Sequence, residues 1–139
     1  MANNYLTYSL AVEFPDKETR DKAMAYYDSD EFRVEVMKIE GETDPDNICI
    51  DFNCTTSGDT ELWISSGDEY GNVEATAALL FWISRHCLNH ARLGFQWAST
   101  CSKLRIGEHC GGAMWTDGKR QHWIHTSDFL SKAKVVNPS

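Results

Sequence analysis

The segment VEATAALLFWISRHCLNHA, residues 73–91, decides the fold of this 139-residue chain. Asn72 stands directly before it as a good helix N-cap, Glu74 lies in the first turn, and Gly94 follows just beyond its end. Residues 77–83 are apolar on every side of a helix, which is typical of a helix covered by neighbours on more than one face. The sequence therefore predicts a central helix that the rest of the chain surrounds.

Segments with the period of two that is typical of half-buried strands lie on both sides of this helix. In chain order they are YLTYSLAVEF (5–14), FRVEVMKIEG (32–41), ICIDFNC (48–54), ELWISS (61–66), LGFQWASTCS (93–102) and the two arms of GGAMWTDGKRQHWIH (111–125). Helix signals occur in PDKETRDKAMAYYDSD (15–30), which Pro15 and Asp16 open, and in TSDFLSKAK (126–134), which Thr126 or Ser127 caps.

Hairpin connections dominate this order of elements. The turn signals TTSGD (55–59) and Asp117-Gly118 each join two strands that would pair in antiparallel fashion. The sequence therefore predicts an α+β fold, in which residues 1–139 form a single domain with a mostly antiparallel sheet of about five to seven strands. Two main helices are expected to pack on one face of that sheet, and a short helix is expected at the C-terminal end.

The composition is that of a globular protein rather than a disordered or membrane protein. Apolar residues make up 42% of the chain, and it has neither a basic leader with an apolar core nor an apolar run of bilayer length. Five cysteines, an odd number without C-x-x-C spacing, are expected to be free thiols. We therefore expect a soluble protein of the host cell cytoplasm.

The charges divide unequally along the chain. Residues 1–75 contain 18 acidic against five basic residues, a balance of −13, whereas residues 76–139 contain three acidic against eight basic residues, a balance of +5. If the acidic half gathers in space, its field repels nucleic acid and attracts basic protein surfaces. This asymmetry favours a basic protein as the partner and disfavours direct binding of nucleic acid.

The stretch RIGEHCGGAMW (105–115) and its surroundings contain the residue types that zinc sites and thiol enzymes use. Cys101, His109, Cys110 and His122 are a candidate set for metal binding or for a cysteine nucleophile and its base. His86 and His90 also stand one helical turn apart, the geometry of a two-histidine metal pair. A small metal- or thiol-dependent enzyme is therefore an alternative reading of the sequence.

A structural turn is the favoured interpretation of the same stretch. Adjacent residues of an extended chain point to opposite faces, so His109 is a poor base for Cys110. The glycines at 107, 111 and 112 are explained by positive φ or by close approach of two backbones, as in a bulge. We therefore predict no metal, cofactor or catalytic residue here.

Two further kinds of site have weak support. Lys103 and Arg105 stand before flexible glycines but lack the strand–loop–helix context of a phosphate loop. Lys119-Arg120 beside Trp123 resembles a stacking surface for nucleic acid, yet the net charge of −8 opposes phosphate binding.

The second half of the chain carries a resemblance. The pattern G-F-x-W-A-x-T-C-S, then R-x-G-E, then a Gly-rich turn that ends in Gly-Ala, resembles a group of small uncharacterised proteins of phages, prophages and other mobile elements. The likeness covers about residues 61–130 and implies a fold and a genomic setting, not a reaction. His109 and Cys110 stand where that pattern has an aromatic residue and then glycine. The resemblance therefore assigns no mechanism to the His-Cys pair.

These observations favour a non-enzymatic protein-binding module, encoded by a phage or mobile element, that inhibits a host defence protein. Its partner would be a host protein with a basic, nucleic-acid-binding surface, and no membrane is involved. Exposed tryptophans, which are common anchors of interfaces, would add to the contact. The candidate binding residues are Asp28, Asp30, Glu31, Glu42, Asp44, Asp46, Asp68, Glu69, Arg105 and Trp115. A structural or regulatory domain that forms a homodimer through the central helix is a further alternative.

Overall fold

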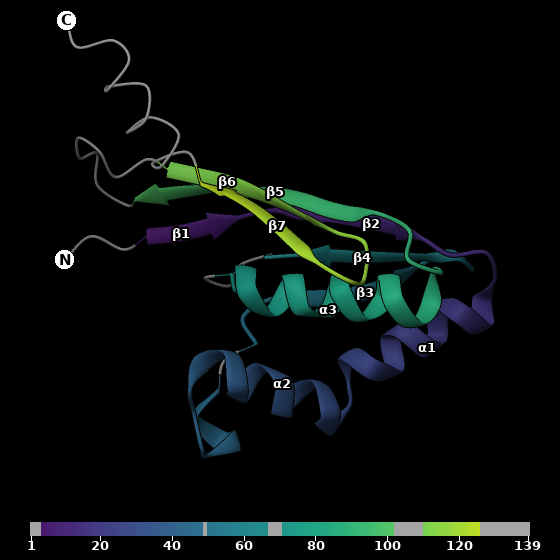
Figure 1. The fold of residues 1–139 in the computed structure, drawn as a ribbon, viewed down its shortest axis with the longest axis horizontal. Helices are drawn as coiled ribbons and strands as arrows, with labels where there is room; N and C mark the ends of the chain where they lie inside the picture. The colour runs from purple at the N-terminus through teal and green to yellow at the C-terminus, as the bar shows by residue number, and fades with distance from the viewer. Residues whose placement is uncertain (1–3, 49, 67–70, 102–109, 126–139) are drawn as a thin grey trace, which may run out of the picture.

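The computed structural model describes residues 4–48, 50–66, 71–101 and 110–125 and has an α+β architecture (Figure 1). In chain order its elements are β1 (Asn4–Thr7), β2 (Ser9–Glu13), α1 (Lys17–Tyr27), α2 (Asp30–Glu40), the 3-10 helix η1 (Pro45–Asn47), β3 (Asn53–Ser57), β4 (Glu61–Ser65), α3 (Val73–Cys87), β5 (Leu93–Cys101), β6 (Cys110–Thr116) and β7 (Gln121–His125). The α+β class is confirmed. The short helix expected at 126–134 lies outside the described residues.

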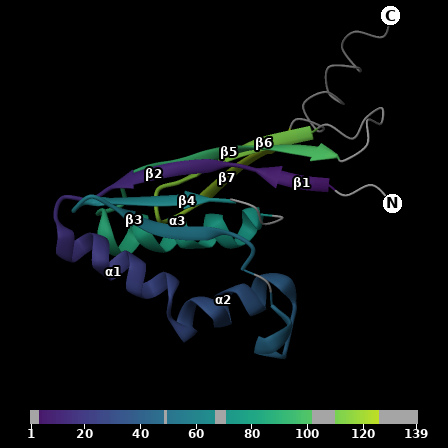
Figure 2. The same ribbon diagram turned by 180° about the vertical axis from the view of Figure 1, so that it is seen from behind.

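The strands form two antiparallel sheets, and the expectation of one sheet is thereby corrected. One sheet has the order β1-β5-β6-β7 and the other has the order β2-β4-β3. Tyr8 lies between β1 and β2. The alternation of exposed and more buried side chains continues across it, from Thr7 to Phe14. Its N–H donates to Ser66 Oγ at 3.2 Å, and the N–H of Ser66 donates to Tyr8 O at 3.0 Å. The N-terminal segment thus changes partner from β5 to β4, and Figure 2 shows β1 and β2 in line.

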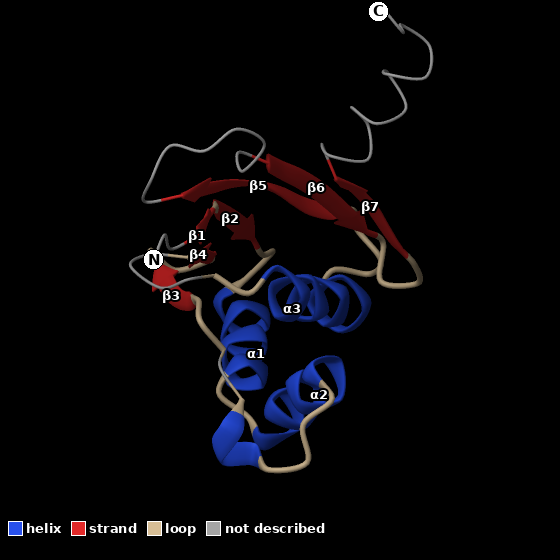
Figure 3. Cartoon of the chain, turned by 90° about the vertical axis from the view of Figure 1, so that its left-hand side faces the viewer, coloured by secondary structure: helices blue, strands red, loops and turns tan. Residues whose placement is uncertain are grey.

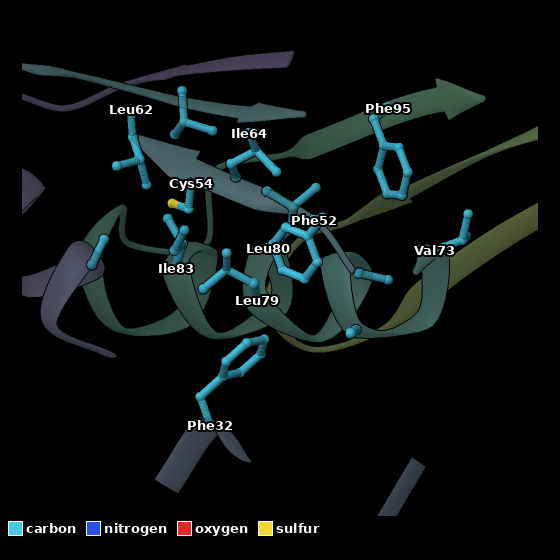
Figure 4. Close-up of a cluster of buried hydrophobic side chains, with 14 of the residues drawn as sticks. Phe32, Phe52, Cys54, Leu62, Ile64, Val73, Leu79, Leu80, Ile83 and Phe95 are labelled. Atoms are coloured by element: carbon cyan, nitrogen blue, oxygen red, sulfur yellow. The ribbon is translucent and has the colours of Figure 1, made fainter. Parts of the chain in front are cut away.

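Helix α3 lies between the four-stranded sheet and the other two helices. Its inner side meets β5 and β6, while α1 and α2 pack against it from the side away from that sheet (Figure 3). Leu79, Leu80 and Ile83 are fully buried, and Phe32 of α2 reaches α3 from the side opposite to the β4 residues (Figure 4). The prediction of a central, covered helix is therefore confirmed, and the described residues form three α-helices where two main ones were expected.

The ends of α3 follow from local signals. The Asn72 side chain accepts a hydrogen bond from the N–H of Ala75 at 3.0 Å, as expected of the N-cap. The helix ends at Cys87, earlier than the sequence suggests, because Asn89 and His90 adopt left-handed backbone with φ of 51° and 64°. The chain then turns directly into β5, which contains Gly94.

The alternating pattern predicts a strand at residues 32–41, but residues 32–40 belong to helix α2 and Gly41 is its C-cap. Ser29 caps the helix, since its Oγ accepts a hydrogen bond from the N–H of Phe32 at 3.2 Å, and Gly41 ends it with φ of 70°. Phe32 and Val36, four positions apart, are fully buried, whereas Val34 is 47% exposed. The strand prediction was wrong because an alternating apolar pattern also contains the i, i+4 spacing of a helix.

The hairpins agree with the sequence, with one shift. Strands β3 and β4 pair as expected, but β3 covers 53–57 instead of 48–54. The β6–β7 turn has Gly118 at φ 77°.

Gly112 is explained by the close approach of a neighbouring side chain, because a Cβ there would lie 2.5 Å from Cζ2 of Trp97. Arg105 and Gly107 lie outside the described residues.

Candidate functional site

Acidic side chains gather on α2 and the segments that flank it. Six of the predicted residues, Asp28, Asp30, Glu31, Glu42, Asp44 and Asp46, lie here, and α2 adds Glu35 and Glu40. We call these eight residues the acidic ridge. All are exposed except the partly buried Glu35. In Figure 1 the helix α2 that carries the ridge lies on the side of the molecule opposite to β5 and β6.

Local hydrogen bonds hold the ridge to its helix. Asp44 Oδ1 accepts from the N–H of Asp46 at 3.0 Å, and Arg33 Nη2 donates to the carbonyl of Pro45 at 3.3 Å. Asn72 Nδ2, at the start of α3, donates to Glu40 Oε1 at 3.2 Å. The segment after α2 is thereby folded back beside the helix, so carboxylates from both lie on one side of the molecule.

Few cations neutralise the ridge. Between residues 28 and 46 the sequence has two basic residues, Arg33 and Lys38, against eight acidic ones. In the described ranges the one salt bridge joins Arg20 to Asp21, which lie outside the ridge. Within the same ranges no ridge carboxylate therefore forms an ion pair, and a negative field extends from this side into solvent.

A groove of about 380 Å³ opens beside the ridge, where the end of α1 meets α2 and α3. Its lining residues are Tyr26, Glu31, Glu35, Ala78, Phe81, Trp82 and Gln121, and we call it the aromatic–acidic groove. The rings of Tyr26 and Trp82 stack with centroids 4.0 Å apart and planes 2° apart. Burial, with the nearby Glu35 and Glu31 carboxylates, raises the pKa of Tyr26 to about 12. The groove thus combines aromatic surface with negative charge.

Trp115 lies elsewhere on the molecule. It is 36% exposed on the face of β6 that points away from α3, since its neighbours Met114 and Thr116 are buried. The His122 ring stacks on it at 4.0 Å, and the Arg92 guanidinium lies 4.9 Å from its ring centroid. The structure therefore separates Trp115 from the acidic ridge by the α3 layer. Asp68, Glu69 and Arg105 lie outside the described residues.

Among the residues considered for metal or thiol chemistry, the structure brings the backbones of Cys101 and Cys110 near each other, because Cys110 pairs with Ser99, two positions before Cys101 on β5, but it places His122 away from both. His122 pairs with Trp115, five positions along β6 from Cys110, which is about 17 Å at the rise of a strand. His90 lies beyond the end of α3, where its Nδ1 is 3.0 Å from Asp117 O, so it shares no helical face with His86. Within the described ranges no three His, Cys, Asp or Glu side chains gather as metal ligands would. His109 lies outside those ranges.

Two thiols can be described, and both are free, as expected. Cys54 is buried in the core and Cys87 is partly buried at the end of α3. Burial raises the pKa of the Cys54 thiol to about 12 and also raises that of Cys87. Both therefore stay protonated at neutral pH, which is unlike the lowered pKa of a catalytic cysteine.

Comparison with known proteins adds no assignment. The chain matches no protein-family model, no curated protein and no solved structure. None of the helices described here has the length and apolar character needed to cross a bilayer.

Sequence reasoning missed the groove and one of its carboxylates. The alternating pattern predicts a strand at Glu35, and in a strand its spacing of four residues from Glu31 does not bring the two side chains together. The helix signal was present in Ser29, an N-cap residue followed by two acids, and could have revealed the pair. No sequence pattern predicts the stacking of Tyr26 on Trp82, because those residues are 56 positions apart.

Proposed function

We propose that this protein is a non-enzymatic binding protein that docks on a basic surface of a partner protein through the acidic ridge. The observation that carries the proposal is the gathering of eight carboxylates on α2 and its flanks without an ion pair among the described residues. Opposite charges across an interface increase the association rate and select against acidic partners. The interaction is expected to weaken as salt is added, because the ridge is exposed to solvent.

The proposal extends to an inhibitor of a host defence protein. Proteins that bind nucleic acid present lysine and arginine along the groove that receives phosphates. A ridge of carboxylates can occupy such a groove and exclude the nucleic acid. The resemblance of residues 61–130 to small proteins of phages and mobile elements supports this biological setting.

Capture from a nuclease-treated bacterial lysate tests the proposal. The immobilised protein is expected to retain a basic protein, which elutes as NaCl is raised to about 0.5 M. The variant Asp28→Lys/Glu42→Lys/Asp46→Lys is expected to lose that protein. All three side chains are exposed: Asp28 is the C-cap of α1, Glu42 follows the end of α2, and Asp46 lies in the short 3-10 helix η1.

A matched control separates the ridge from net charge. The variant Glu13→Lys/Glu18→Lys/Asp59→Lys changes the net charge by the same amount, at exposed positions on β2, α1 and the β3–β4 turn. It is expected to retain the captured protein. Equal loss in both variants, or capture that is insensitive to salt, would refute docking through the ridge.

A further inference from the structure

Three helices each supply one part of the aromatic–acidic groove, and β7 adds Gln121. Helix α1 supplies Tyr26, α3 supplies Trp82 with Ala78 and Phe81, and α2 supplies Glu31 and Glu35. The two glutamates are four residues apart and therefore lie on one face of α2. The stacked pair of Tyr26 and Trp82 fixes the position of both rings beside these carboxylates.

This combination selects the charge of an occupant. Glu31 and Glu35 would repel an anion. A neutral apolar group would remove their carboxylates from water without offering them a hydrogen bond or an opposite charge, and this desolvation costs free energy. A cation attached to an apolar stem satisfies both parts, because its charge pairs with the carboxylates and its stem contacts the rings. Charge complementarity therefore favours an organic cation.

The Trp82 ring already interacts with a cation of this chain. Lys22 Nζ lies 5.9 Å from the Trp82 ring centroid and donates to the carbonyl of His86 at 3.0 Å. The face of the ring that Tyr26 covers is closed by stacking. The open groove therefore offers an edge of the indole together with Phe81 and the two carboxylates.

We propose that the aromatic–acidic groove binds an arginine side chain presented by the partner protein. This inference rests on the proposed function, since the partner's basic surface supplies the arginine. Arginine fits better than lysine because its planar guanidinium is weakly hydrated and can pair with two carboxylates at once. Arginine is also enriched among residues that dominate protein interfaces.

Titration with defined peptides, followed by NMR of the ¹⁵N-labelled protein, tests the groove without the partner. The probes are acetyl-Gly-Arg-Gly-amide and the same peptide with citrulline, which is neutral and nearly isosteric with arginine. The arginine peptide is expected to shift the indole N–H of Trp82 and the amides of Glu31 and Glu35. The citrulline peptide is expected to leave them unchanged, and a lysine peptide is expected to bind more weakly.

A pair of variants with equal charge changes localises the binding. Glu31→Gln/Glu35→Gln is expected to weaken binding of the arginine peptide by at least about fivefold, because charge-assisted hydrogen bonds are lost. Glu42→Gln/Asp46→Asn removes the same charge from the ridge outside the groove and is expected to keep the affinity within about twofold. Unchanged amide shifts elsewhere in each spectrum report an intact fold.

The outcomes separate this inference from the proposed function. Equal shifts with arginine and citrulline, or equal loss of affinity in both variants, would refute arginine binding in the groove. Capture of a basic protein without peptide binding would refute the groove and leave docking through the ridge standing. Peptide binding in the groove without any captured basic protein would refute the proposed function and leave the groove's preference for arginine standing.

Discussion

Gly112 shows how one residue fixes the spacing of two strands. A Cβ at this position would meet the carbonyl oxygen of Ile124 on β7 and lie 2.5 Å from the buried ring of Trp97. We expect Gly112→Ala to lower the free energy of unfolding by about 2 kcal/mol, because neither neighbour can move without disturbing the core. Urea denaturation measures this value. Gly58→Ala, where φ is 59° and no atom lies within 4 Å, is the control for backbone strain alone and should cost less.

Asp117 links stability to pH at the β6–β7 turn. Its carboxylate accepts hydrogen bonds from the N–H groups of Lys119 and Arg120 at 2.9 and 3.0 Å, which lower its pKa. A lowered pKa means that the ionised form stabilises the folded state above about pH 4, and this contribution is lost as pH falls through the folded-state pKa. The non-titrating variant Asp117→Asn should therefore be less stable than wild type at pH 6 and approach it near pH 2.5. Parallel urea-denaturation profiles across that range would contradict the role of Asp117.

The helical state of α2 can be tested with two valines that a strand would place on one face. Val36 is fully buried, and Val34, two positions away, is 47% exposed. We expect Val36→Ala to lower the free energy of unfolding by about 2 kcal/mol through lost burial and a cavity. Val34→Ala should change it by less than about 0.5 kcal/mol. Equal effects of the two substitutions on the urea midpoint would contradict the helix.

The junction between the two sheets depends on the hydroxyl of Tyr8. That oxygen lies 2.7 Å from Thr76 Oγ1 and accepts from the N–H of Asn72 at 3.1 Å, so it joins the N-terminal strands to the start of α3. We expect Tyr8→Phe to destabilise the fold by about 1–2 kcal/mol, because partners of a buried hydrogen bond are left unsatisfied. Hydrogen exchange should show the loss first at the start of α3. A uniform loss of protection across all elements would argue against this local link.

Charge acts at the scale of the whole molecule. The net charge is −8, and the ridge concentrates much of it on one side. We expect the free energy of unfolding to rise by on the order of 1 kcal/mol between about 0.01 and 0.3 M NaCl, because salt screens repulsion between the carboxylates. The Asp28→Lys/Glu42→Lys/Asp46→Lys variant should lose most of this dependence, whereas the Glu13→Lys/Glu18→Lys/Asp59→Lys variant should keep more of it. Salt-independent denaturation of the wild type would contradict a repulsive ridge.

The sequence by itself determined the features that neighbouring residues along the chain encode. Asn72 and the apolar run 77–83 specify a covered helix, and Asp117-Gly118 marks the turn between β6 and β7, which spans residues 117–120 and not two residues. The excess of acids in the first half is also a property of sequence alone. The helix cap and the turn depend on interactions within a few residues. They therefore form in the same way however the rest of the chain folds.

Only the tertiary structure decided the state of α2, the division into two sheets and the composition of the groove. The pattern of residues 32–36 fits a strand and a helix equally, and burial of Phe32 and Val36 against the rest of the core selects the helix. Tyr8 changes strand partners because Ser66 and α3 bind it from distant parts of the chain. The groove joins Tyr26, Glu31 and Trp82 for the same physical reason. Contacts between residues far apart in sequence depend on how whole elements pack, and a local sequence pattern does not determine that packing.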